Sequence, residues 1–272
     1  MKTFKRTVVY LILFMGALAM VFPFFWMLVS SLKTAAEVNT TPPTFWPQNL
    51  MFENYLYAFE KAPFLIYFKN SVIVTVSCVV FTVFTTILAA FAFSRLKFPG
   101  RDLLFSLLLA MMMIPFEILI ITNYTTIVKL GLIDTLVALI IPFTSSIFYT
   151  YILRNFFFSI PDSLYYSARV DGANNWRYLW RIMVPIAKPA LVTIALLNAI
   201  ASWNSFLWTM IATNSTEVRT LPFGLYAFMS SSGIRYERLM AAATIVVVPM
   251  IFLFIVFRKH IVAGVSRGGL KG

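Results

Sequence analysis

The chain has 272 residues, of which 60% are hydrophobic, 17% aromatic and only 12% charged, with a mean hydropathy of +0.85. A soluble domain carries roughly a quarter charged residues, so this composition excludes a water-soluble globular fold and predicts a polytopic membrane protein. The formal net charge is +12, but the basic residues are spread over separated segments, which argues against a nucleic-acid-binding surface.

Six apolar stretches are long enough to cross a bilayer core of about 30 Å, which needs about 20 residues per helix. Their hydrophobicity is continuous and lacks a period of two residues, which predicts helices. They cover residues 8–29, 71–93, 103–121, 136–153, 189–211 and 239–257. The first is longer than the roughly 7–15 apolar residues of a signal-peptide core, so we expect an uncleaved helix. The expected fold class is an all-α integral membrane protein with six transmembrane helices.

Lysines and arginines are distributed unequally between the two sides of such a bundle. Segments 2–6, 95–101, 154–188 and 258–271 hold 15 of the 22 basic residues. The positive-inside rule therefore places these segments, and both termini, in the cytoplasm. This topology divides the chain into an N-terminal helix with a long outer loop (1–70), a transmembrane core (71–258) and a cytoplasmic C-terminal tail (259–272).

The inner segment 154–188 is the one cytoplasmic region large enough to hold structure of its own. Asp162, directly after Pro161, fits a helix N-cap, and its carboxylate suits the positive end of the helix dipole. Gly172 fits the position just past a helix C-terminus, where the left-handed conformation costs glycine little. Asn174 or Asn175 then caps a second helix.

This second helix carries an apolar face at helical spacing, formed by Trp176, Leu179, Trp180 and Met183. Pro185 and Pro189 end it and start the fifth membrane helix. We therefore expect a helix, a sharp corner and a second helix at the inner membrane surface. An interfacial amphipathic anchor without a partner is the alternative.

Polar side chains form a stripe along the fifth predicted membrane helix. Asn198, Ser202, Ser205 and Thr209 fall at positions i, i+4, i+7 and i+11. Polar groups cost free energy against lipid, so this face looks at a cavity on the translocation path or at another helix. Hydrogen bonding between helices is the alternative role.

Three further residues are candidates for the translocation path. Glu117 is the one ionisable residue deep in a predicted span, and it either lines a cavity or lies near the outer interface. Trp203 lies about 14 residues, or ~21 Å, from the start of its helix, within the membrane core. With Asn204 beside it, Trp203 forms part of a gate, stacks on a transported solute or simply packs. Trp208 fits an interfacial aromatic belt.

Several kinds of chemistry are missing from the sequence. No Gly-x-x-x-x-Gly-Lys-Ser/Thr motif occurs, so the chain does not bind ATP by a P-loop. Cys78 is the only cysteine and His260 the only histidine, which excludes an internal disulfide and a His-based metal cluster. We expect no cofactor and no enzymatic activity. A secondary transporter remains an alternative, although no inverted repeat is apparent.

The segment Pro161-Asp-Ser-Leu-Tyr-Tyr-Ser-Ala-Arg-Val-Asp-Gly-Ala-Asn174, followed by Pro185 and Lys188-Pro-Ala190, resembles the "EAA" coupling loop of binding-protein-dependent ABC importer permeases. The similarity is greatest to the second permease of maltose-type and multiple-sugar importers, which have the type I importer fold. Other matching pieces include Pro23-Phe-Phe-Trp-Met-Leu-Val-Ser-Ser-Leu-Lys33, Gly131-Leu-Ile-Asp-Thr135, Trp203-Asn-Ser-Phe-Leu-Trp208 and Gly269-Leu-Lys-Gly272. The resemblance covers nearly the whole chain.

This resemblance implies that the corner docks on an ATPase subunit and passes its movement to the membrane helices. The residues concerned are Tyr166, Ser167, Ala168, Arg169, Asp171, Gly172 and Trp176. One departure stands out, because the family's glutamate falls at Tyr166 and its first alanine at Ser167. Tyr166 carries no charge near neutral pH, so we expect it to pack or hydrogen-bond where the glutamate would form an ion pair.

The partners implied are a second permease, two ATP-binding subunits and an extracytoplasmic solute-binding protein received by the outer loops, especially 40–68. The location implied is the cytoplasmic membrane of a bacterium or archaeon, with the tail 266–272 reaching between the ATPases. The predicted spans contain no cationic residue, which favours a neutral sugar or oligosaccharide. Importers of glycerol-phosphate, polyamines or amino acids are the alternatives.

Overall fold

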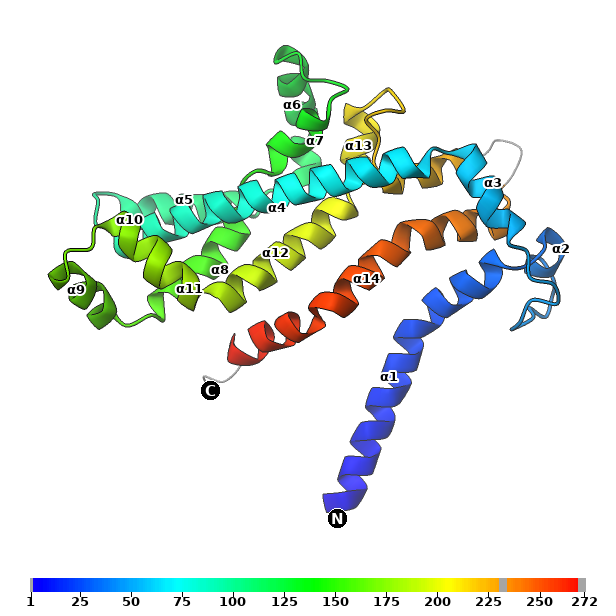
Figure 1. The fold of residues 1–272 in the computed structure, drawn as a ribbon, viewed down its shortest axis with the longest axis horizontal. Coiled ribbons are helices and arrows are strands. Elements are labelled where there is room, and N and C mark those ends of the chain that lie inside the picture. The colour runs from blue at the N-terminus through cyan, green and yellow to red at the C-terminus, as the bar shows by residue number, and fades with distance from the viewer. Residues whose placement is uncertain (1, 230–233, 269–272) are drawn as a thin grey trace. The chain divides into compact units, whose positions relative to one another are not determined.

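The computed structural model describes residues 2–229 and 234–268, and every regular element within these ranges is a helix (Figure 1). The α-helices are α1 (Lys2–Ser31), α2 (Ala35–Val38), α3 (Glu53–Lys61), α4 (Phe64–Arg95), α5 (Arg101–Met111), α6 (Phe116–Lys129), α7 (Leu136–Ile140), α8 (Ile147–Phe158), α9 (Asp162–Val170), α10 (Asn175–Tyr178), α11 (Val184–Ile186), α12 (Lys188–Trp203), α13 (Leu207–Ala212) and α14 (Tyr236–Gly268). Ile141–Phe143 and Leu221–Phe228 are 3₁₀ helices, and Leu179–Met183 forms a π-helical turn. The all-α expectation is confirmed.

Three helical segments are unbroken and apolar enough to cross a membrane: Lys5–Ser31, Phe64–Arg95 and Tyr236–Val256. Three pairs also pass this test but are bent: Arg101–Met111 with Phe116–Lys129 by 99°, Leu136–Phe143 with Ile147–Phe158 by 44°, and Asn175–Ile186 with Lys188–Trp203 by 78°. Counting each bent pair as one span gives up to six.

The predicted helices at 103–121 and 136–153 are therefore interrupted, and that at 189–211 is interrupted at a separate place. Pro115, which lacks a backbone N–H, is the N-cap of α6 with an extended backbone (ψ 143°), and proline cannot continue a helix from the preceding turn. The fifth stretch breaks between Trp203 and Leu207. Hydropathy records the cost of exposing side chains to water, and it is insensitive to backbone breaks that the surrounding helices cover.

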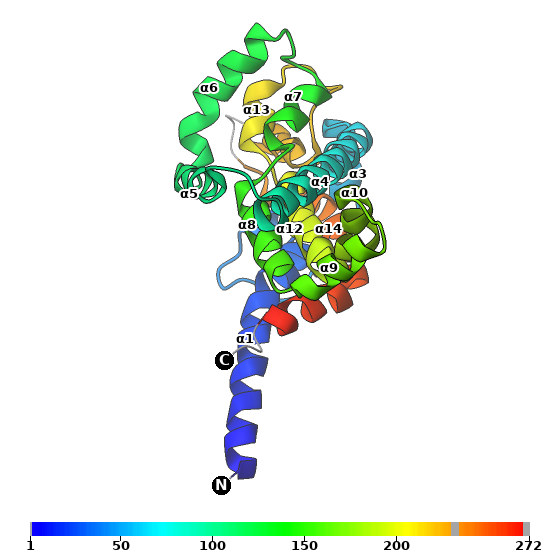
Figure 2. The same ribbon diagram turned by 90° about the vertical axis from the view of Figure 1, so that its left-hand side faces the viewer.

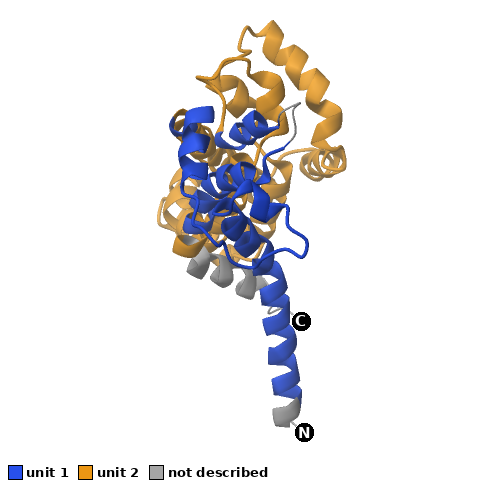
Figure 3. Ribbon diagram, turned by 90° about the vertical axis from the view of Figure 1, so that its right-hand side faces the viewer, with its two compact units in different colours: residues 1–65, 221–252 blue, residues 66–220, 253–272 orange. Residues whose placement is uncertain are grey.

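The chain divides into two compact units, which Figure 3 distinguishes by colour. The first comprises residues 1–65 and 221–252, and the second comprises residues 66–220 and 253–272. The corner and the polar stripe both belong to the second unit. The last four residues of the expected C-terminal tail, 269–272, lie outside the described residues, while residues 259–268 continue α14.

In the first unit, the long loop after α1 contains two short helices. Thr34 and Glu37 form a capping box at the start of α2, in which each side chain satisfies a backbone N–H of the other residue. These backbone hydrogen bonds, from Thr34 and then from Gln48, hold the pKa of Glu37 below its usual value. The Asn54 side chain donates to the carbonyls of Ser31 and Lys33, both at 2.9 Å. The loop is thus folded onto the C-terminal end of α1.

The second unit packs around α4, α8 and α12, which run side by side in Figures 1 and 2. Buried residues from these helices form one apolar cluster with residues of the corner: Ile87, Ala90, Leu153, Phe157, Ala168, Tyr178, Leu179, Met183 and Ile194. A second cluster includes Trp208, whose indole N–H donates to the carbonyl of Ala138 at 3.0 Å. Trp208 is 2% exposed, so the predicted place in an aromatic belt is wrong. It is a core residue with a satisfied N–H.

Candidate functional site

The corner begins with α9, whose N-terminus differs from the prediction. Pro161 is the N-cap, Asp162 is the first helical residue, and no side chain caps the helix. The carboxylate of Asp162 instead pairs with Arg95 at the end of α4. Asp162 still lies in the first turn, where a negative charge is favourable, but its main contact reaches another helix.

The turn after α9 is the predicted glycine corner. Gly172 has φ 76°, and the N–H of Ala173 donates to Ala168 O at 2.8 Å while the N–H of Gly172 donates to Arg169 O at 3.1 Å. This pair of bonds defines a Schellman motif, which ends a helix with a residue in the left-handed conformation. The Asn174 side chain then accepts from the N–H of Arg177 at 2.8 Å, which makes Asn174, rather than Asn175, the cap of α10.

One face of the corner packs on the membrane helices. Ala168, Tyr178, Leu179 and Met183 are all buried in the cluster with α4, α8 and α12. Tyr165 packs edge-to-face on Tyr178, with ring centroids 5.0 Å apart. This apolar contact packs the corner against α4, α8 and α12.

The opposite face is exposed and contains most of the predicted coupling residues. Tyr166 is 63% exposed, Val170 88% and Trp176 59%. Ser167, Arg169, Asp171 and Gly172 are also exposed, whereas Ala168 faces the core. Tyr166 and Val170 are four residues apart on α9 and therefore neighbours on one face of the helix. An exposed apolar pair of this kind, among polar residues on a capped corner, is suited to contact with another protein.

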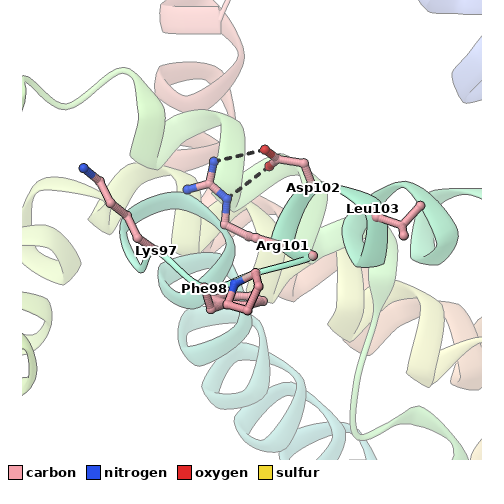
Figure 4. A pocket seen from close by; sticks show the side chains of 7 residues that line it. Lys97, Phe98, Arg101, Asp102 and Leu103 are labelled. Atoms are coloured by element: carbon pink, nitrogen blue, oxygen red, sulfur yellow. Dashed lines mark hydrogen bonds and ion pairs between the residues drawn. The ribbon is translucent and has the colours of Figure 1, made fainter.

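The adjacent turn between α4 and α5 forms an open hollow lined by residues 97–103. Figure 4 shows Arg101 aimed at Asp102, with Lys97 pointing away from the pair. The Arg101 Nε lies 3.0 Å from the Asp102 carboxylate, and Arg154 approaches the same carboxylate at 3.4 Å. Since these charges already pair with one another, we assign no ligand to this hollow.

The four residues of the predicted polar stripe meet at one cavity of about 100 Å³. Its other walls include Val74, Leu139, Phe143, Trp208 and Thr220. The side-chain oxygen of Asn198 is buried with no hydrogen-bond partner among the described residues. Thr209 is satisfied, because its hydroxyl lies 3.1 Å from that of Thr220 and 3.0 Å from Ser205 O.

The size of this cavity limits what it holds in the present conformation. A water needs about 10–15 Å³ of such volume, so there is space for several waters. Pockets for small-molecule ligands are usually ~300 Å³ or larger. The cavity is therefore large enough for water but not for a sugar, which would require it to open.

Trp203, Asn204 and Glu117 lie outside the lining of this cavity. Trp203 is 6% exposed and packs edge-to-face on Phe68, with ring centroids 5.9 Å apart. Asn204 is the exposed C-cap of α12. Glu117 is exposed in the first turn of α6, beyond the 99° bend. The structure thus groups the stripe but not these three residues.

One contact was not predicted from the sequence as a site. Asp134 has φ 59°, and its carboxylate accepts hydrogen bonds from the N–H groups of Asn214 at 2.8 Å and Ser215 at 2.9 Å. These bonds, that to Ser215 foremost, hold the pKa of Asp134 below its usual value. The positive φ, which Asp tolerates better than most residues, was not visible in the sequence motif Gly131–Thr135.

A family model described as "Binding-protein-dependent transport system inner membrane component" matches residues 82–267. The chain belongs to this family. The permease is 33% identical over 272 residues to the arabinooligosaccharides transport system permease protein AraQ of Bacillus subtilis, with 98% of this chain and 96% of the relative covered. It is 31% identical over 264 residues to the diacetylchitobiose uptake system permease protein NgcG of Streptomyces coelicolor, covering 96% and 87%.

A solved structure has the same fold. The permease superposes with a TM-score of 0.80 and 26% identity on a chain of a bacterial ABC transporter involved in the import of the acidic polysaccharide alginate, covering 94% of this chain and 96% of that one. The type I ABC importer permease fold is thereby confirmed. The permease is a multi-pass inner-membrane protein of a transport family, and a transport permease is not itself an enzyme.

Proposed function

We propose that the permease forms the translocation path of an ATP-driven sugar or oligosaccharide importer together with a second permease. Two separate ATP-binding subunits supply the energy, and an extracytoplasmic solute-binding protein delivers the sugar to the outer loops, including 40–68. The names of the relatives support the substrate class, since they specify arabinooligosaccharides and diacetylchitobiose. The lack of a P-loop motif in the chain supports a separate ATPase.

The observation that carries this proposal is the corner at Gly172. Its inner face is fixed to the membrane helices and its outer face presents Tyr166 and Val170. A helix that is rigidly attached on one side and apolar on the other transmits movement from a docked partner to the helices behind it. Closure of the ATPases thus moves the core of the second unit between inward-open and outward-open arrangements.

Tyr166 gives this docking contact an apolar character. A phenol ring contributes a large contact area and one hydroxyl, and it carries no charge near neutral pH. Arg169, Asp171 and Trp176 form the rim of the contact. We infer that this ATPase contact depends less on salt than an ion pair would, because salt screens charges and not packing.

The polar stripe on α12 and α13 is our candidate for the path. Asn198, Ser202, Ser205 and Thr209 offer neutral hydrogen-bonding groups, which suit sugar hydroxyls better than an anion. Opening of the break between α12 and α13 would enlarge the cavity, with Trp203 and Asn204 at its edge. Glu117 completes the candidate set from α6. Importers of glycerol-phosphate or polyamine remain the alternative, and cationic residues in the spans, which an anionic solute favours, are missing here.

The topology proposed has both termini in the cytoplasm, so that the corner and the end of α14 share the ATPase side. Purification of the affinity-tagged permease from its native membrane tests the assembly. We expect a second permease, an ATPase and a solute-binding protein with a bound sugar to co-purify. Transport by the permease alone in liposomes, or labelling of residues 162–188 from the outside of intact cells, would contradict the proposal.

A further inference from the structure

Arg95 is the last residue of α4 and its side chain is only 6% exposed. Its guanidinium makes three contacts with one short stretch of chain. One terminal nitrogen donates to Phe157 O at 2.7 Å and to Ile160 O at 2.6 Å, and the other pairs with the Asp162 carboxylate. All three partners are more than 60 residues away along the chain.

These partners mark the path from the fourth membrane span to the corner. Phe157 lies in the last turn of α8, Ile160 lies in the connection, and Asp162 is the first residue of α9. The carbonyls at a helix C-terminus lack partners within the helix, and a cation is favourable there because of the helix dipole. One side chain therefore binds the end of α8 and the start of α9 at once.

The geometry requires arginine. A guanidinium presents several N–H groups in a fixed plane, so it can serve two carbonyls and a carboxylate together. Lysine has a compact ammonium that is unable to span the same acceptors in one plane. The low exposure of Arg95 strengthens its two hydrogen bonds to carbonyls, while the Asp162 carboxylate is 73% exposed and adds a weaker, solvent-facing ion pair.

A neighbouring arginine shows that this role is specific to Arg95. Arg154 on α8 donates to Phe93 O at 3.1 Å and stacks on Phe105 and Phe158, 4.0 and 4.6 Å from the ring centroids. These contacts tie α8 to α4 and α5. They do not include α9, which Arg95 reaches through Asp162.

We propose that Arg95 is a positioning residue that attaches the corner to α4, the second membrane span. Through this attachment (the mount), α4, the end of α8 and α9 move as one body. This inference rests on the proposed function for its consequence, since the ATPase would push on α9 and the mount would carry that movement into α4. The apolar cluster holds the corner against the bundle, and Arg95 fixes the orientation of α9 at its N-terminus. Without Arg95, α9 would pivot about the apolar contact and absorb the movement.

Hydrogen–deuterium exchange of the purified importer complex in lipid nanodiscs tests the mount. Arg95→Ala should speed exchange of the amides of residues 158–166 by on the order of tenfold, as expected for loss of hydrogen bonds to a charged group. Arg95→Lys and Asp162→Asn should give smaller increases, because each retains part of the contact. Arg101→Ala is the matched control, since Arg101 contacts Leu96 O and Asp102 on its own turn. Unchanged exchange in Arg95→Ala, or an equal change in Arg101→Ala, would overturn the mount.

A second measurement separates transmission from simple anchoring. Adding MgATP with orthovanadate to the wild-type complex should alter exchange in residues 204–219, at the far end of the second unit. We expect this distant response to be lost in Arg95→Ala and Arg95→Lys while the complex stays assembled, and kept in Arg101→Ala. A full response in both Arg95 variants would refute transmission through Arg95. A wild-type preparation without any ATPase would instead refute the proposed function, and the exchange at 158–166 would still decide the mount.

Discussion

The hydroxyl of Tyr165 lies 3.0 Å from the side-chain oxygen of Asn175, across the corner that Gly172 makes. The bond joins α9 directly to α10, and Tyr165 also packs on Tyr178. The angle between the two helices is thus held by a side-chain bridge as well as by the backbone. A corner held at a fixed angle can transmit movement, and mutations can test its backbone turn and its exposed face separately.

Replacing Gly172 with valine should uncouple transport from ATP hydrolysis. The φ of 76° is strained for a β-branched residue, at a cost of about 1–2 kcal/mol, although a Cβ there would meet no atom within 4 Å. The effect therefore reports the corner's backbone and not a steric clash. ATPase activity and sugar uptake by the reconstituted importer are the measurements. Gly131→Val, which imposes a similar strain at φ 68° in another turn, should leave the ratio of uptake to hydrolysis nearer wild type.

Replacing Tyr166 with alanine should weaken binding of the ATPase by about tenfold or more, because buried tyrosines at interfaces often contribute 1–2 kcal/mol or more. Tyr166→Phe separates the two possible contributions, since it keeps the ring and removes the hydroxyl. Pull-down of the ATPase at several salt concentrations measures both effects. Tyr236→Ala removes a ring of 48% exposure in the other unit and should have no effect. A steep loss of wild-type binding with salt would contradict an apolar contact.

Asp134 should stabilise the permease in its ionised form. Its folded-state pKa is lowered, so its contribution is fully present above the unfolded value of about 3.9 and is lost as pH falls through the lower folded value. Thermal unfolding in detergent should therefore show that Asp134 stabilises the permease equally at pH 7 and at pH 5. Asp134→Ala should lower Tm by a few degrees at pH 7. Asp134→Asn should lower Tm less, because asparagine tolerates positive φ and keeps an acceptor oxygen. Equal losses in the two variants would show that the acceptor is unimportant.

Asn198→Ala should reduce uptake strongly and thermal stability only slightly. The side-chain oxygen of Asn198 has no partner among the described residues, so the substitution loses no hydrogen bond there, and the contact that it does lose is the one between the Asn198 side chain and the Tyr149 hydroxyl. Uptake of the sugar found on the co-purified binding protein, and the Tm of the permease, are the two measurements. Thr193→Ala on the same helix removes a hydroxyl that donates to Pro189 O at 3.0 Å and lies outside the cavity lining, so it should leave uptake unchanged. A fall in Tm with normal uptake would assign Asn198 to helix packing.

The corner could be predicted from sequence because its determinants are local. Gly172 supplies a conformation that other residues adopt at a cost. The side-chain oxygen of Asn174 caps α10 by accepting from the N–H of Arg177, only three residues later. The polar stripe could be predicted in part, since the helical repeat places Asn198 and Ser202 on one face of α12. Ser205 and Thr209 reach the same cavity across the break between α12 and α13. Asp162 was placed in the correct turn, but its partner Arg95 is 67 residues away, and no local pattern indicates that pair.

The sequence is sufficient to show a helical membrane protein with a capped corner between two membrane helices. Water and lipid penalise exposed groups at every position, and backbone preferences act within a few residues, so both leave a readable pattern. The three-dimensional packing was needed to show where the spans break, that Trp208 bonds to Ala138 O 70 residues away, and that Arg95 holds the start of α9. Those features depend on which helices lie next to each other. The hydrophobic pattern does not specify this, because several arrangements of the same helices would bury the apolar side chains equally well.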